Sequence, residues 1–157
     1  MKDLIGSVVE SRSSSDSYSR VHTMDVMSSE QRSNLMSRIR GGDTKPEIQV
    51  RKLLHAMGYR FTLDNRDLPG TPDIVLPRYE AVIFVNGCFW HRHRNCRFAY
   101  MPKSRVDFWQ AKFDANVARD RRVTGQLRRD GWRVWTVWEC QLRKPEQVAA
   151  RLERLLG

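Results

Sequence analysis

The segment AVIFVNGCFWHRHRNC, residues 81–96, carries the strongest indication of the fold in this sequence. Its first five residues form an uninterrupted apolar run, which is typical of a buried strand, and Gly87 ends the strand. The residues that follow combine cysteines, histidines and two large aromatic side chains on what should be a loop. Open α/β sheets place their chemistry at the carboxyl ends of their strands. We therefore expect the functional centre of the protein on this loop.

The composition and charge of the chain predict one soluble domain that binds a polyanion. The 157 residues are 40% hydrophobic and carry a formal net charge of +10. Lys and Arg side chains gain affinity by releasing counterions from phosphates, so nucleic acid is the expected partner, and a merely basic surface is the alternative. No apolar run approaches the length of a membrane span and no secretory signal is recognisable, so we expect a cytoplasmic location.

The N-terminal part of the chain differs in composition from the rest. Residues 1–26 are poor in core-forming side chains and rich in serine, which predicts a disordered extension. Met24 and Met27 are alternative starts. Residues 28–40 form a short basic segment, which is either an arm on DNA or a solvated linker. We expect residues 27–157 to form a single domain.

The remaining sequence alternates between helical and strand-like patterns, which predicts the α/β class. Thr44 and Glu47 have the spacing of a helix capping box, so capping is one role open to Glu47. Pro72 cannot donate to a sheet, so a strand should begin near Asp73 and form a hairpin with the strand at 81–85. The expected helices are 44–57, a helix N-capped by Ser104, 116–130 and 145–156, and the expected strands are 59–63, 73–76, 81–85 and 132–138.

Four residues have the spacing of a structural zinc site. A C-x4-H-x2-C pattern on the central loop is completed by a distant third cysteine, and three cysteines with one histidine are a usual tetrahedral zinc set. With four protein ligands and no open position, this zinc would be structural. Buried cysteines without a metal are the alternative, and His91 is an alternative to His93 as the ligand. The candidate ligands are Cys88, His93, Cys96 and Cys140.

Two further residues suggest acid and base chemistry. Asp73 opens an apolar strand, where a carboxylate is costly to bury unless it binds a cation or a hydrogen-bond donor. An ordinary turn aspartate is the alternative. His91 is left over once the zinc ligands are assigned, and an imidazole near Asp73 could take a proton from water.

Three aromatic residues lie in polar or basic surroundings. Phe89, Trp90 and Trp109 have side chains suited to stacking on bases or wedging between them. Packing in the core is the commoner role of any single aromatic residue. Since Phe89 and Trp90 lie within the metal loop, we favour contact with nucleic acid.

Taken together, six motifs closely resemble the very short patch repair endonucleases. Their order and spacing match over nearly all of residues 27–156, and G-C-F-W-H is a specific signature. The motifs are T-x-x-E at 44–47, LPG-x-PD at 68–73, VIF-x-x-GCFWH at 82–91, FW at 108–109, NV-x-RD at 116–120, and GWRV through VWEC at 131–140.

The resemblance implies a restriction-endonuclease-like fold, with a central mixed sheet flanked by helices. It implies an enzyme that nicks DNA 5′ to the thymine of T:G mismatches left by deamination of 5-methylcytosine. Asp73 is then a magnesium ligand together with the backbone carbonyl of Val85, and His91 is the general base for water. Asp120 is implied as an acidic partner in the active site and Glu47 as a supporting acid.

The resemblance also bears on cofactors and partners. It implies zinc at the four candidate ligands, and it matches Phe89, Trp90 and Trp109 to the aromatics that wedge beside the mismatch. The expected cofactors are thus catalytic Mg²⁺ and structural Zn²⁺. The expected partner is double-stranded DNA with a T:G mismatch, bound by a monomer near the nucleoid. Functional links to a DNA cytosine methyltransferase and a repair polymerase are also expected.

Some positions depart from the family pattern. Val85 stands where some members have threonine, and Asn86 stands where some carry a second active-site histidine. Between His91 and Cys96 the loop is one residue longer than in some relatives.

Two alternatives to mismatch-directed nicking remain from the sequence. One is a zinc-stabilised DNA-binding module without catalysis, and the other is a general restriction-type nickase. The presence of Asp73, His91 and Asp120 together favours an enzyme, because binding alone needs none of them.

Overall fold

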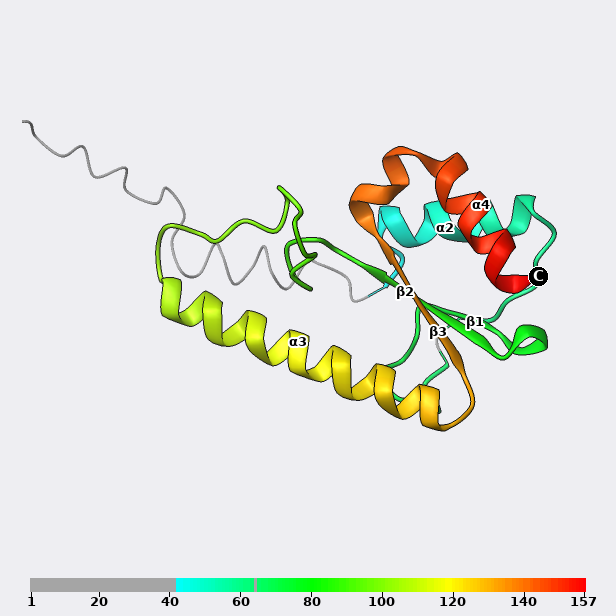
Figure 1. Cartoon of the computed structure of the whole chain (residues 1–157), viewed down its shortest axis with the longest axis horizontal. Coiled ribbons are helices and arrows are strands. Elements are labelled where there is room, and N and C mark those ends of the chain that lie inside the picture. The colour runs from blue at the N-terminus through cyan, green and yellow to red at the C-terminus, as the bar shows by residue number, and fades with distance from the viewer. Residues whose placement is uncertain (1–41, 64) are drawn as a thin grey trace, which may run out of the picture. The chain divides into compact units, whose positions relative to one another are not determined.

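The computed structural model describes residues 42–63 and 65–157 of the chain (Figure 1). The predictions for residues 1–41, namely the disordered extension, the alternative starts and the basic arm, lie outside the described residues. Within the described ranges, no helix is long and apolar enough to cross a membrane. The extent of the domain, 27–157, stays a prediction.

A mixed three-stranded sheet forms the centre of the fold. Its strands are β1 (Ile74–Leu76), β2 (Ala81–Asn86) and β3 (Arg133–Trp138), in the order β1-β2-β3. β1 and β2 pair antiparallel, and a short 3₁₀ turn, η1 (Pro77–Tyr79), joins them. β2 and β3 pair parallel, with Val85 opposite Val137. The hairpin and the last strand were both predicted, and the mixed sheet confirms the expected fold class.

Helices cover both faces of this sheet. α2 (Lys45–Ala56) and α4 (Pro145–Leu156) lie on one face, and α3 (Val106–Arg129) lies on the other (Figure 1). Side chains alternate across a strand, so β2 contributes Ile83 to the core shared with α2 and α4. It contributes Val82 to the core under α3, beside Leu127. This arrangement explains the apolar run of β2, since both of its faces are buried.

α2 begins at the predicted cap. The Glu47 amide donates to Thr44 Oγ1 over 3.4 Å, and Thr44 Oγ1 donates to Glu47 Oε1 over 2.8 Å. The first of these bonds satisfies an amide that the first turn of a helix leaves without a partner. Thr44 is confirmed as the N-cap, while the Glu47 side chain accepts from the Asp43 amide, whereas a full capping box uses the amide of the N-cap residue itself.

α3 differs from the prediction of two helices with Ser104 as the N-cap. The N-cap residue is Arg105, which has a φ of 53°, and no side chain caps the helix. A single helix of 24 residues follows. The two expected segments join because Phe113, between them, is 1% exposed and continues the apolar face of the helix.

The predicted strand at 59–63 is wrong. Only Thr62 pairs with the sheet, through an isolated bridge to Val75 whose two hydrogen bonds measure 2.8 and 2.9 Å. Tyr59 and Phe61 instead pack against the core between the sheet and helices α2 and α4. The alternating pattern therefore reflects burial of alternate side chains without a ladder of backbone pairs.

We expect the close approach of Gly70 to α3 to make Gly70→Ala strongly destabilising. Gly70 has a φ of +73°, and a Cβ placed there would lie 2.4 Å from Val123 Cγ1. Positive φ costs about 1 kcal/mol or more, and crowding adds about 1–3 kcal/mol. Urea denaturation measures the loss.

Gly131→Ala is the matched control, because Gly131 has a φ of +91° but nothing within 4 Å of the added Cβ. In a Val123→Ala background, the loss of stability caused by Gly70→Ala should be smaller, and the loss caused by Gly131→Ala should be the same as in the wild-type background. Equal losses for the two glycine variants would contradict the role of the Val123 contact.

Candidate active site and metal centre

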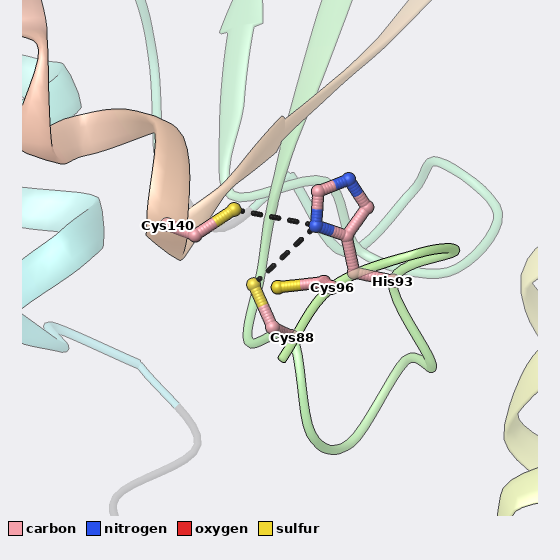
Figure 2. A group of neighbouring side chains, drawn as sticks. All are labelled: Cys88, His93, Cys96 and Cys140. Atoms are coloured by element: carbon pink, nitrogen blue, oxygen red, sulfur yellow. Dashed lines mark hydrogen bonds between the residues drawn. The ribbon is translucent and has the colours of Figure 1, made fainter. Parts of the chain in front are cut away.

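The four predicted zinc ligands come together in the structure. Cys88, His93 and Cys96 lie on the loop after β2, and Cys140 lies in the 3₁₀ turn η2 (Glu139–Arg143) after β3 (Figure 2). Their ligand atoms all lie within 4.8 Å of one another. His93 Nδ1 is 3.7 Å from Cys88 Sγ and 3.3 Å from Cys140 Sγ. The cluster could therefore hold a metal ion, and it contains His93, the favoured histidine.

The dimensions of this cluster suit a tetrahedral ion. Zinc bonds of about 2.3 Å to sulfur and about 2.0 Å to nitrogen place those two atoms about 3.5 Å apart. The two sulfur to nitrogen distances given above lie on either side of that value. Burial raises the pKa of the Cys88 thiol to about 12, so a metal must displace its proton. The His93 ring is held flat against Trp138, with centroids 4.2 Å apart and planes 13° apart.

Asp73 lies immediately before β1 and faces the end of β2. The Val85 amide donates a hydrogen bond of 2.7 Å to Asp73 Oδ2. Burial, with a smaller effect of the Glu47 charge, raises the pKa of Asp73 to about 6, although the Val85 amide, Arg51 and His91 oppose the rise. The carboxylate thus lacks sufficient compensation in its ionised form, and a bound cation would supply it.

His91 is paired with Asp120 of α3. His91 Nδ1 lies 2.5 Å from Asp120 Oδ2. Burial favours a higher pKa for Asp120, but hydrogen bonds and positive charge from His91 and Arg119 outweigh it and lower the pKa. Asp120 is therefore ionised and accepts a hydrogen bond from Nδ1 of His91, so in the neutral imidazole Nε2 is the nitrogen that can accept a proton from another group.

Two residues of α3 that the sequence reasoning missed also position this loop. Asn116 Nδ2 donates to the Trp90 carbonyl over 3.1 Å, and Arg119 Nη2 lies 3.3 Å from Asp120 Oδ1. Asn116 and Asp120 are four residues apart, which places them on one helical face. That spacing was visible in the motif at 116–120. This spacing indicates that one face of α3 can bind two consecutive residues of the loop, Trp90 and His91.

Glu47 is buried, with 5% of its surface exposed. Its Oε2 accepts bonds from the Asp43 amide at 2.8 Å and from Arg51 Nη2 at 3.1 Å, while Oε1 accepts from Thr44. Both oxygens are therefore engaged in holding the start of α2. Its charge nevertheless acts on Asp73, as the pKa of Asp73 shows.

The three predicted DNA-contacting aromatics form one cluster. The Phe89 ring centroid lies 5.1 Å from that of Trp90 and 5.5 Å from that of Trp109, and the two tryptophans are 6.0 Å apart. All three are partly exposed, whereas Phe113 beneath them is buried. Exposed Tyr100 packs against Phe89 and extends the aromatic surface.

The fold resembles that of a solved endonuclease domain. The chain is similar to the catalytic domain of the homing endonuclease I-Bth0305I, with a TM-score of 0.52 and 20% identity, over 71% of this chain and 93% of that domain. This likeness places the fold among the restriction and homing endonucleases. Together with the cysteine and histidine cluster, it confirms the predicted architecture.

Sequence comparison gives the family. The model described as DNA mismatch endonuclease Vsr matches residues 24–97. The DNA mismatch endonuclease Vsr of Escherichia coli is 43% identical over 133 residues, covering 83% of this chain and 85% of that protein. The type II nicking enzyme V.XorIIP of Xanthomonas oryzae is 51% identical over 132 residues, covering 84% and 96%. The chain belongs to the Vsr family of DNA endonucleases, so the resemblance and the prediction of a DNA-hydrolysing enzyme are confirmed.

We expect Asp73→Asn to stabilise the metal-free protein at neutral pH. The folded pKa of Asp73, about 6, exceeds the ordinary value of 3.8, so wild type loses stability as pH rises through that interval. Asparagine carries no charge to bury, and it should add about 1 kcal/mol after allowance for solvent screening. Thermal melting in a chelating buffer measures the difference, which should vanish near pH 4.

Asp67→Asn is the matched control, because Asp67 is an exposed loop residue. Its melting temperature should follow that of wild type at every pH. A metal-free Asp73→Asn protein that melts below wild type near pH 7.5 would contradict the uncompensated burial of this carboxylate.

Proposed function

We propose that this endonuclease nicks duplex DNA 5′ to the thymine of a T:G mismatch left by deamination of 5-methylcytosine, and so initiates very short patch repair. The observation that carries the proposal is the His91–Asp120 pair, with His91 close enough to the partly buried Asp73 for its charge to lower the pKa of that carboxyl. The matched family, that of the DNA mismatch endonuclease Vsr, supports the mismatch as the substrate.

We assign the catalytic magnesium to Asp73 and the Val85 carbonyl. Mg²⁺ prefers oxygen ligands, and the raised pKa of Asp73 fits a carboxylate that is completed by a cation. The N–H and C=O of one strand residue point to the same side, so the Val85 carbonyl faces the same edge as its amide, which contacts Asp73. Bound there, the ion would stabilise charge on the scissile phosphate. A backbone ligand also makes valine in place of threonine acceptable.

His91 then acts as the general base. Its Nε2 takes a proton from the attacking water, whose oxygen bonds to phosphorus while the bond from phosphorus to the leaving sugar oxygen breaks and that oxygen takes a proton from solvent. Asp120 holds the Nδ1 proton and stabilises the imidazolium that forms. Since His91 and Asp120 together supply the base, no second histidine is needed at position 86, where this chain has asparagine. Glu47 supports the site through its charge and its hold on α2.

The aromatic cluster of Phe89, Trp90 and Trp109 would wedge into the base stack beside the mismatch. Its partial exposure and its support from buried Phe113 suit this role, because a wedge must reach DNA without collapsing. Core packing, the alternative for these residues, is the role of Phe113.

Zinc at Cys88, His93, Cys96 and Cys140 would have a structural role. Cys88 precedes the aromatic and catalytic residues at 89–91, and His93 and Cys96 follow them. Cys140 would connect this loop to η2 through the ion. We further propose that the protein acts as a monomer near the nucleoid, with links to a DNA cytosine methyltransferase and a repair polymerase.

A general nicking role is the second candidate, because several relatives are named type II nicking enzymes. Strand cleavage of a labelled duplex with one T:G mismatch, beside its fully paired control, tests both. We expect a nick 5′ to the mismatched thymine only, with magnesium and not with chelator. Equal cutting of both duplexes would support the general nickase and overturn mismatch specificity.

His91→Ala should slow this nicking by about a hundredfold or more, because a general base is lost. Asp120→Asn should slow it less, since the base remains but is poorly oriented. Asp107→Asn is a control, since Asp107 is an exposed acid in the first turn of the same helix. Unchanged rates for His91→Ala would remove His91 from the mechanism.

We expect the purified protein to contain one zinc ion, which metal analysis by mass spectrometry measures. Cys140→Ala should abolish this content and lower the melting temperature, because structural zinc contributes directly to folding. His91→Ala is the control that should keep its zinc, since His91 pairs with Asp120. A zinc-free wild-type protein, or zinc loss in His91→Ala alone, would contradict the ligand set.

A further inference from the structure

A groove of about 630 Å³ lies between β3 and α4, on the face of the sheet that is opposite α3. We name it the β3–α4 groove. Its floor is apolar and includes Trp135, Val148, Leu152 and Leu155. His91 and Asp120 are not among its lining residues, and Asp120 belongs to the helix on the other face. The groove is therefore separate from the proposed active site.

One wall of the β3–α4 groove is an open sheet edge. β3 is the last strand in the order β1-β2-β3 among the described residues. The Arg133 amide donates to the Glu80 carbonyl over 2.7 Å, so the amides of residues 133, 135 and 137 point toward β2. Val134 and Thr136 thus present their N–H and C=O groups outward. An edge of this kind is a template for pairing with another strand.

The rim of the β3–α4 groove is basic. Its charged lining residues are Arg143, Lys144, Arg151 and Arg154, and no Asp or Glu lines it. The Arg151 guanidinium lies over the Trp135 ring, 5.2 Å from the centroid. Cys140 lies at the same groove, which brings any occupant next to the metal cluster.

We propose that the β3–α4 groove binds an extended, acidic segment of a partner protein, which adds a strand to the edge of β3. The open edge supplies backbone hydrogen bonds, the apolar floor takes alternate side chains, and the basic rim selects acidic ones. A second copy of this chain would bring its own net charge of +10 against the rim. Duplex DNA has no backbone amides to pair with the edge and no side chains for the apolar floor.

The test uses the full-length, metal-loaded protein and a fluorescent peptide that alternates glutamate with valine. Fluorescence anisotropy should show saturable binding. The same peptide with alternate backbone nitrogens methylated should not bind, because methylation blocks strand pairing and keeps the charge. Arg151→Glu with Arg154→Glu should weaken binding by about tenfold or more, since charge complementarity at the rim is reversed.

Arg128→Glu with Arg129→Glu is the matched control, because these arginines are exposed in the last turn of α3 and make the same change of charge outside the groove. It should bind the peptide as wild type does. A second variant, Thr136→Pro, removes an outward amide that β2 does not use, so it should abolish binding and still melt cooperatively.

Three outcomes would overturn the proposal. Equal binding of the methylated peptide would show attraction by charge alone. Equal weakening of peptide binding by the groove variant and by the α3 control variant would show that binding depends on the net charge of the protein and not on the rim. Loss of affinity for a DNA duplex, with peptide binding unchanged in the groove variants, would make the rim a nucleic-acid surface.

Discussion

The hydrogen bond between His91 and Asp120 is the interaction on which the proposed catalytic arrangement depends. It joins a loop without regular secondary structure to the middle of a long helix. A loop of this kind has little intrinsic order, and a base must be held within fractions of an ångström to be effective. The bond of Asn116 to the Trp90 carbonyl secures the neighbouring residue from the same helix. The cysteine and histidine cluster restrains the loop from its other side.

Much of this arrangement could be predicted from the sequence because its signals are local. The run at 81–85, the cap at Thr44 and the spacing of Cys88, His93 and Cys96 each depend on residues close together in the chain, and Cys140 was then the one cysteine left to complete the set. The motif match then brought Asp120 to the site, although no local pattern links it to His91. What failed was the segment 59–63, where alternation of side chains does not reveal whether a neighbouring strand is long enough to pair. The start of α3 failed because Arg105, in a left-handed conformation, carries no capping signature.

The charge of Asp73 lowers the stability of the folded protein at neutral pH. Asp73 is partly buried within reach of the charge of Glu47, and one backbone amide with partial help from Arg51 and His91 does not fully compensate its own charge. A protein selected for stability alone would place an apolar or neutral residue there. Glu47 shows the opposite arrangement, since both of its oxygens have partners.

Because α3 is continuous, it fixes the distance between the aromatic cluster and the His91–Asp120 pair. Trp109 and Asp120 lie on one uninterrupted helix, and a rise of about 1.5 Å per residue sets their separation along its axis at roughly 16 Å. Inserting one residue between them would lengthen this interval and turn the aromatic end by about 100° relative to the carboxylate. The geometry of a single helix thus sets the spacing between the aromatic surface that would contact a base pair and the carboxylate that orients the general base.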